Sequence, residues 1–236
     1  MATLACLHHL AQPFLGLAER PLRAAGLDLD ERRLREGDAL PSLGEVDGIL
    51  TFGGSESVLD IDQDPLLQAE AALLRDAVAA GVPVLAICLG GQVLSHALGG
   101  TVRRLPSRTV AWVELEALPA AREDAVFSAL GSPVSVLQWN EDAFTLPPSG
   151  TELLTGATVG VAAFRAGPCA WGVQFHPDVD RAALEGWYER YGGWLAQAGV
   201  VEDAARAADE RHLAAHAEAS ERLFTAFARV VGGRGR

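Results

Sequence analysis

The sequence predicts an α/β fold in which helices cover both faces of a mostly parallel sheet, and three features support this prediction. Apolar strand-like runs alternate with helical patterns over the first 81 residues, as in folds built from strand–helix–strand units. The run 82–87 is apolar at every position, which is typical of a strand buried on both faces. From Arg181 onward the chain is helical in period and rich in alanine.

The elements of the first half each have a local reason. A short apolar segment at 2–8 predicts the first strand, and a helical pattern follows over 14–25. The apolar run 46–52 predicts a buried strand that ends at a pair of glycines. Asp64 and Pro65 then begin a helix, because Asp caps free N–H groups and Pro suits the first helical position.

The second half is strand-rich before it becomes helical. The predicted strands are 110–115, 134–139, 159–164 and 170–175, and the predicted helices are 181–198 and 201–231. We expect a single domain over 1–236. In it, about 1–180 form the α/β core, and about 181–231 form a helical C-terminal extension packed on that core.

The composition excludes several functions. All 19 basic residues are Arg, so the chain has no lysine for a Schiff base, for pyridoxal phosphate or for an ATP-binding P-loop. The net charge is −12, and an acidic surface repels phosphate backbones, so nucleic acid is not an expected partner. No apolar run approaches the roughly 20 residues that cross a bilayer, and the first residues do not resemble a signal peptide.

The three cysteines are Cys6, Cys88 and Cys169. This odd, sparse set is no disulfide framework, and no pair has metal-ligand spacing. We therefore expect a reducing, cytoplasmic location, no bound metal and no cofactor. Cys6 and Cys169 are interpreted as packed structural residues.

Cys88 stands at the most informative position. The apolar strand 84–87 runs directly into it, and Gly90 and Gly91 follow before a helical pattern. Small residues around a nucleophile permit the sharp strand-to-helix turn that presents it. At a helix N-terminus the dipole and the free N–H groups favour a thiolate. The sequence therefore predicts that Cys88 is a nucleophile, although a buried cysteine at a strand end is a common alternative.

A second candidate segment is Trp171-Gly-Val-Gln-Phe-His-Pro-Asp178. A strand leads to His176, and Pro177 turns the chain. His176 and Asp178 are then placed to act as a base and the carboxylate that orients it. By itself, a strand-end histidine hydrogen-bonded to a nearby aspartate would be an equally simple interpretation.

The remaining histidines carry less weight. His8 and His9 end the first strand, where they could face a pocket at the carboxyl edge of the sheet. We expect His96, inside the helix after Cys88, to be packed, and His212 and His216, on the last helix, to be exposed.

With these motifs the chain resembles the class I glutamine amidotransferases. More narrowly, it resembles the stand-alone group similar to the glutaminase domain of GMP synthase. The motifs that carry the resemblance are Phe52-Gly-Gly54, Ile87-Cys-Leu-Gly-Gly-Gln92, Gln138-Trp-Asn-Glu-Asp142 and Gln174-Phe-His-Pro-Asp178. The second and fourth motifs occur in this order and about ninety residues apart, and this combination is specific for the family.

The resemblance implies a flavodoxin-like sheet with extra strands and a Cys-His-Glu triad. Carried over to this chain, it makes Cys88 the nucleophile, His176 the base and Asp178 the substitute for the usual Glu. It also implies oxyanion-hole N–H groups at Gly54 and Leu89. Substrate-binding positions would be Gly53, Gln92, Trp139, Asn140 and Glu141.

Three positions depart from the family pattern. Asp178 is one methylene shorter than Glu. Asn140 stands where many relatives carry His, and Glu141 stands where Gly is usual, which brings a side chain and a negative charge near the pocket. These changes concern the identity of the substrate more than the thiol chemistry.

Three functions remain open on the sequence. The leading hypothesis is a cysteine-dependent glutamine amidotransferase that forms a γ-glutamyl thioester on Cys88 and passes ammonia to a separate synthetase chain. The second is a hydrolase of γ-glutamyl amides or peptides without ammonia transfer, in which Asn140 and Glu141 admit a larger or cationic amine. The third is a non-catalytic binding or regulatory module, against which the intact Cys88 and His176 argue.

Overall fold

The computed structural model describes residues 1–10 and 12–234, and these contain one nine-stranded sheet. The order of strands across the sheet is β2-β1-β3-β4-β9-β8-β7-β5-β6. Their bounds are β1 Thr3–His8, β2 Asp28–Arg33, β3 Gly48–Thr51, β4 Val84–Ile87, β5 Val102–Ala117, β6 Val134–Phe144, β7 Gly150–Gly156, β8 Gly160–Ala166 and β9 Ala170–Val173.

The first five strands in this order are parallel and confirm the predicted flavodoxin-like core. The ladders β2-β1, β1-β3, β3-β4 and β4-β9 are all parallel, and their order is the one found in flavodoxin-like sheets. The remaining ladders are antiparallel, and they add the expected extra strands. In open α/β sheets, ligands bind beyond the carboxyl ends of the strands.

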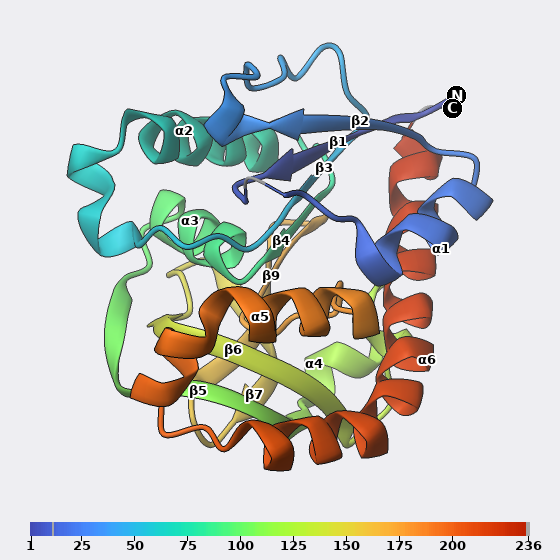
Figure 1. Cartoon of the computed structure of the whole chain (residues 1–236). Coiled ribbons are helices and arrows are strands. Elements are labelled where there is room, and N and C mark those ends of the chain that lie inside the picture. Colours follow the sequence, from blue (N-terminus) through green and yellow to red (C-terminus); the bar gives the residue numbers. More distant parts are fainter. Residues whose placement is uncertain (11, 235–236) are drawn as a thin grey trace.

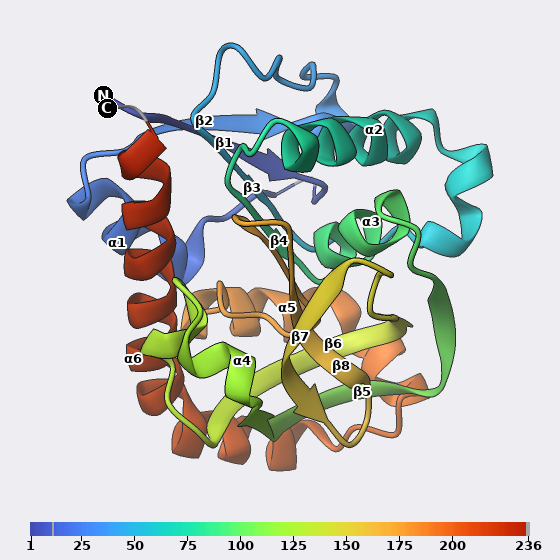
Figure 2. The same ribbon diagram turned by 180° about the vertical axis from the view of Figure 1, so that it is seen from behind.

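Helices cover both faces of the parallel strands, as the sequence predicts. Their bounds are α1 Glu19–Ala24, α2 Pro65–Ala79, α3 Leu89–Ala97, α4 Pro119–Arg122, α5 Arg181–Gln197 and α6 Glu202–Arg234. Figures 1 and 2 show α2 and α3 on one face of β1, β3 and β4, and α1 and α6 on the other. The long α6 runs along the edge of the molecule past both halves of the sheet.

The alternation of side chains along β4 shows why helices must pack on both faces of the sheet. Leu85 and Ile87 belong to the core that includes Leu223 and Phe227 of α6. Val84 and Ala86, of the opposite parity, belong to the separate core formed with α2 and α3. Because successive strand residues point to opposite faces, a strand that is apolar throughout requires two apolar layers.

Helix α2 begins where the sequence predicts. The Asp64 side chain accepts hydrogen bonds from the N–H groups of Leu66 and Leu67 at 3.0 and 3.2 Å, and Pro65 is the first helical residue. Such a cap contributes about 1 kcal/mol.

Two strands and one helix differ from the sequence prediction. Strand β2 was missed because its sequence, DLDERR, is polar, as suits an edge strand with exposed positions. Strand β7 was missed as well. The helix expected over 14–25 is a short 3-10 turn, Gly16–Ala18, followed by α1. There, the Leu17 N–H donates to the backbone oxygen of Asp178 at 2.8 Å instead of to a helical partner.

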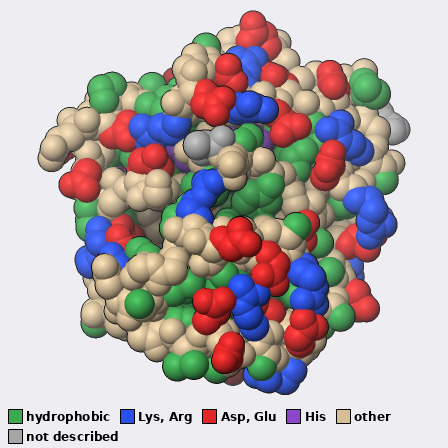
Figure 3. Space-filling model, viewed as in Figure 1, with side chains coloured by type: hydrophobic (Ala, Val, Ile, Leu, Met, Phe, Trp, Pro, Cys, Tyr) green, Lys and Arg blue, Asp and Glu red, His purple; other side chains and the backbone are tan. Residues whose placement is uncertain are grey.

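Charged side chains of both signs are interspersed over the face seen in Figure 3, with arginines beside Asp and Glu. Of the helices that the structure describes, none is long and apolar enough to cross a membrane.

Candidate active site

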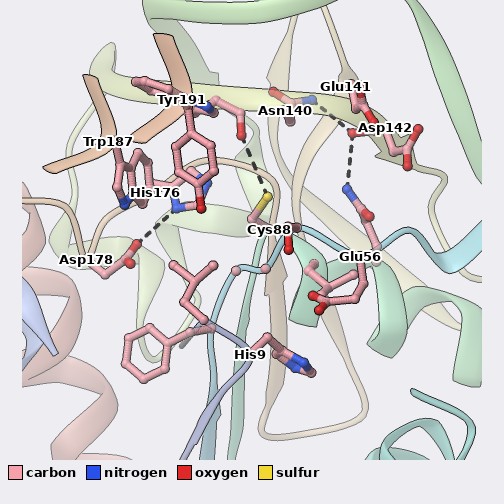
Figure 4. Close-up of a pocket in the computed structure, with 18 of the residues that line it drawn as sticks. His9, Glu56, Cys88, Asn140, Glu141, Asp142, His176, Asp178, Trp187 and Tyr191 are labelled. Carbon is pink, nitrogen blue, oxygen red and sulfur yellow. Dashed lines mark hydrogen bonds and ion pairs between the residues drawn. The ribbon is translucent and has the colours of Figure 1, made fainter. Parts of the chain in front are cut away.

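A cavity of about 230 Å³ lies beyond the carboxyl ends of β1, β3 and β4. The residues implied by the resemblance all line it: Gly53, Gly54, Cys88, Leu89, Gln92, Trp139, Asn140, Glu141, His176 and Asp178. Figure 4 shows the central part of this arrangement. His8 and His9, at the end of β1, line the cavity too.

Cys88 occupies a strained turn between β4 and α3. Its backbone angles are φ 52° and ψ −105°, and among the described residues no other non-glycine residue has a positive φ. The two glycines that follow are required by close packing: a Cβ on Gly90 would lie 2.7 Å from Cγ2 of Thr51, and one on Gly91 would lie 2.7 Å from the Val173 oxygen. A strained residue held this way is typical of a functional site.

His176 lies between a carboxylate and the thiol, as Figure 4 shows. Its Nδ1 is 3.4 Å from Oδ1 of Asp178, which leaves Nε2 for the sulfur. Its backbone N–H donates to the Leu137 oxygen at 2.9 Å, so strand β6 holds the backbone of His176 in place. Both side chains are buried.

The charges of Cys88 and Asp178 affect the protonation of His176. Burial by itself disfavours an imidazolium, but the negative charge of Cys88 and the nearby carboxylate of Asp178 outweigh it and raise the pKa of His176 to about 10. The arrangement therefore favours the imidazolium form of His176 beside Cys88. By contrast, burial raises the pKa of the Cys6 thiol far above its usual range, so this thiol stays protonated.

Leu89 and Gly54, the two positions expected to supply oxyanion-hole N–H groups, line the cavity together with Cys88. Leu89 is the first residue of α3, where N–H groups lack helical partners. Gly54 packs closely against Leu89, since a Cβ on Gly54 would lie 2.6 Å from Cδ2 of Leu89. Gly53 leaves room for the imidazole, because a Cβ there would lie 2.9 Å from Cε1 of His176.

The side-chain amides of Gln92 and Asn140 meet at one backbone oxygen. Both donate to the carbonyl of Asp142, at 3.2 and 2.9 Å. Oδ1 of Asn140 is buried and has no hydrogen-bond partner among the described residues. The Trp139 backbone oxygen lies 4.0 Å from the sulfur of Cys88.

Glu141 does not bring the unbalanced negative charge that its sequence position suggests. Arg104 Nη1 and Arg108 Nε each lie 2.7 Å from one of its carboxylate oxygens. Both arginines come from β5, which pairs with β6 across an irregular register between Arg104 and Thr109. The pairing therefore neutralises the charge of Glu141.

Several residues at the site were missed by the sequence analysis. Gln174 of the fourth motif donates from Nε2 to the Cys88 sulfur at 3.8 Å. Glu70 of α2 pairs with His9, which was itself expected near a pocket, and Trp187, Tyr191 and Trp194 of α5 line the cavity. The spacing of these three aromatics on one helical face was the available signal.

Two histidine predictions were wrong. His96 is exposed, because it points away from the sheet on α3. His216 is buried, because its side of α6 packs against the antiparallel strands β5 and β6. In the part of the chain that the structure describes, no group of three or more His, Cys, Asp or Glu side chains could hold a metal ion.

Comparisons with known proteins agree with this geometry. A family model described as glutamine amidotransferase class-I matches residues 17–185. The chain is 28% identical to the glutamine amidotransferase-like protein YfeJ of Salmonella typhimurium over 177 residues, which are 73% of this chain and 74% of that protein. It is 34% identical to the glutamine-hydrolyzing GMP synthase of Thermus thermophilus over 167 residues, 63% of this chain but only 30% of that protein.

The fold is shared with a solved structure as well. A glutamine amidotransferase of Thermotoga maritima superposes with a TM-score of 0.86 over 98% of each chain, at 24% identity. The fold, the geometry around Cys88 and the match over residues 17–185 together show that this chain belongs to the class I glutamine amidotransferase family.

Proposed function

We propose that the chain hydrolyses the side-chain amide of glutamine through a covalent intermediate on Cys88. The thiolate attacks the amide carbon, and the N–H groups of Gly54 and Leu89 hold the resulting oxyanion. The C–N bond breaks as His176 gives its proton to the nitrogen, so ammonia leaves and a γ-glutamyl thioester remains. Water then attacks the thioester, His176 takes its proton, and glutamate and the free thiol are released.

One observation carries this proposal: Cys88 stands in a strained turn at a helix N-terminus, beside a buried imidazole whose Nδ1 lies 3.4 Å from a carboxylate oxygen. A purely structural cysteine gains nothing from such a conformation. The intact Cys88 and His176 also argue against a non-catalytic role.

We further propose that the ammonia passes to a separate acceptor chain. The GMP synthases that resemble this chain are much longer, and it spans about a third of the length of the Thermus protein. These 236 residues contain no lysine and hence no Walker-type P-loop, so an acceptor that binds ATP through such a loop would lie outside them.

A γ-glutamyl amide hydrolase without ammonia transfer is the second candidate. The observation that favours it is the aromatic side of the cavity formed by α5, which could contact a larger amine. The same attack and the same proton transfers apply, with an amine in place of ammonia as the leaving group.

The test is direct. The purified chain is incubated with glutamine and with a panel of γ-glutamyl compounds, and glutamate and amine release are measured. Cys88→Ala should abolish release from every compound, while Cys6→Ala and Cys169→Ala should leave it largely intact. A glutamine-like chloroketone should label Cys88 alone on peptide mapping, and labelling of Cys6 or Cys169 instead would overturn the site.

A further inference from the structure

Three aromatic side chains of α5 form one side of the cavity. Trp187, Tyr191 and Trp194 follow each other at steps of four and three residues, so they share one face of the helix. Trp139 of β6 packs against all three, with ring centroids 5.1, 6.4 and 5.9 Å away respectively. These four residues, all of which line the cavity, are called the aromatic wall below.

Most of the aromatic wall lies beyond the residues that the family model matches. The family match ends at residue 185, so the three α5 aromatics come after it. Helix α5 also departs from helical geometry at Tyr191, with φ −107° and ψ 21°, in the middle of the wall. The three α5 aromatics therefore lie outside the residues that the family model covers, although they line the same cavity as Cys88.

The aromatic wall lies on the side of the cavity where the amine must leave. The rings of Trp187 and His176 meet edge to face, with centroids 4.9 Å apart. Because His176 protonates the departing nitrogen, any substituent on that nitrogen begins beside Trp187. In Figure 4, Trp187 and Tyr191 lie with His176 on one side of Cys88, whereas His9 and Glu56 lie on the other.

The charges around the cavity do not favour a cationic amine. Each carboxylate that lines the cavity in the described part of the chain already has a basic partner. The pairs are Glu56 with Arg35, Glu141 with Arg104 and Arg108, Asp142 with Arg104, and Asp178 with His176. The uncharged part of the lining beside His176 is aromatic, since the ring of Trp187 meets the ring of His176.

We infer that this site prefers γ-glutamyl amides whose amide nitrogen carries an uncharged substituent with an aromatic ring. The aromatic wall binds this ring. The inference rests on the proposed hydrolysis at Cys88 and names its substrate class. Edge-to-face and offset-stacked ring contacts stabilise a bound aromatic group beyond the area that they bury. Glutamine, which has no such group, uses the same catalytic centre without this contact.

The experiment compares four substrates that share the glutamyl part. They are glutamine, γ-glutamyl benzylamide, γ-glutamyl cyclohexylmethylamide and the γ-glutamyl amide of 1,4-diaminobutane, and kcat/KM is measured from glutamate release. We expect the benzylamide to exceed glutamine by about tenfold or more, and the cationic amide to be the poorest of the three larger substrates. The cyclohexyl compound separates a preference for aromatic rings from one for bulk alone.

The matched variants are Tyr191→Leu and Glu189→Gln. Tyr191→Leu should lower the ratio of benzylamide to glutamine kcat/KM by about fivefold or more, because it removes one ring of the wall. Glu189→Gln, on the exposed side of α5, should leave this ratio unchanged. If Tyr191→Leu unfolds the helix, Trp194→Leu is compared with the parent in the same way.

The outcomes separate the inference from the function on which it rests. If glutamine is hydrolysed but the benzylamide is no better than the cyclohexyl or the cationic amide, the inference is wrong and the proposed hydrolysis stands. The same holds if a folded Tyr191→Leu or Trp194→Leu variant leaves the ratio of benzylamide to glutamine kcat/KM unchanged. If no compound releases glutamate, the proposed hydrolysis fails, and the inference fails with it.

Discussion

Oδ1 of Asp178 lies 3.4 Å from Nδ1 of His176, which is longer than the roughly 2.7–3.2 Å of a well-formed N–H···O hydrogen bond. Neither atom has another hydrogen-bond partner among the described residues. The backbone of Asp178 is held by the N–H of Leu17 at 2.8 Å, which resists a shift that would close the gap. The shorter side chain thus leaves His176 less firmly oriented than a Glu would.

Restoring the family's usual residue is therefore expected to help. Asp178→Glu adds one methylene, which lets the carboxylate approach Nδ1 of His176. We expect glutamine turnover to stay within a few-fold of the parent and to lie above it, since the base is better oriented. Steady-state kcat is the measurement, and a loss of tenfold or more would show that the pocket has no room for the longer side chain.

Removing the negative charge should have the opposite effect. Asp178→Asn can still hydrogen-bond to the imidazole but favours the wrong tautomer and does not stabilise the imidazolium. We expect a loss of about 10- to 10³-fold in kcat, smaller than in a serine triad because a thiol needs less activation. Asp180→Asn, whose side chain caps α5 through the Ala183 N–H, is the control and should keep its activity. Equal activity in Asp178→Asn and the parent would make Asp178 a turn residue only.

The protonation of His176 should make stability depend on pH. Its pKa is raised from the ordinary 6.5 to about 10 in the folded chain, against the effect of burial. The folded state therefore binds this proton more tightly, so the stabilisation is complete below about pH 6.5 and is lost as pH rises toward 10. The difference in free energy of unfolding between the parent and His176→Gln should shrink over this range in urea titrations.

Cys88→Ala provides the control for that experiment. It removes the negative charge that raises the pKa of His176 most, so the pH dependence should flatten. If the difference in free energy of unfolding between the parent and His176→Gln stays constant from pH 6.5 to 10, the raised pKa of His176 is contradicted.

His9 and Glu70 form a wholly buried ion pair, with 3.0 Å between Nε2 and Oε2. Burial opposes both charges, yet mutual attraction raises the pKa of His9 and lowers that of Glu70. Thr51 adds a hydrogen bond to Glu70 at 2.5 Å. Glu70→Gln should cost about 3–5 kcal/mol in the free energy of unfolding, because it leaves a buried imidazolium without its counter-charge.

The double variant His9→Gln/Glu70→Gln tests this explanation. Its loss of stability in urea should be smaller than the sum of the losses in the two single variants. The double variant leaves neither a buried imidazolium nor a buried carboxylate without its counter-charge. Glu19→Gln, in the exposed pair of Glu19 with Arg23, should change stability little. Additive single losses would show that the two residues act independently.

The turn after Cys88 should tolerate no added atom. Gly91→Ala places a Cβ 2.7 Å from the Val173 oxygen, a backbone atom that moves only with β9. We expect a loss of about 1–3 kcal/mol and a fall in kcat, because the thiol shifts with the turn. Gly186→Ala is the matched control: its Cβ meets nothing within 4 Å on α5, so the protein should keep its stability or gain slightly. Thermal unfolding and glutamine turnover distinguish the two.

The sequence by itself determined the parts that depend on local pattern. The apolar run 82–87 predicts β4, Asp64 and Pro65 predict the start of α2, and both elements are confirmed. The placement of Cys88 between a strand and a helix was readable for the same reason. Each rests on spacing over a few residues, where backbone sterics and capping act directly. Strand β2 was not predicted, because a strand at the edge of the sheet can have exposed, polar positions and so shows no apolar pattern.

Only the tertiary structure decided what surrounds the thiol. Glu141 is neutralised by arginines more than thirty residues earlier in the chain, and His9 meets Glu70 across the end of the sheet. The aromatics of α5 reach the cavity because the helix packs over β6. These contacts join residues far apart in sequence, and the burial that sets their charges exists only once the chain is folded.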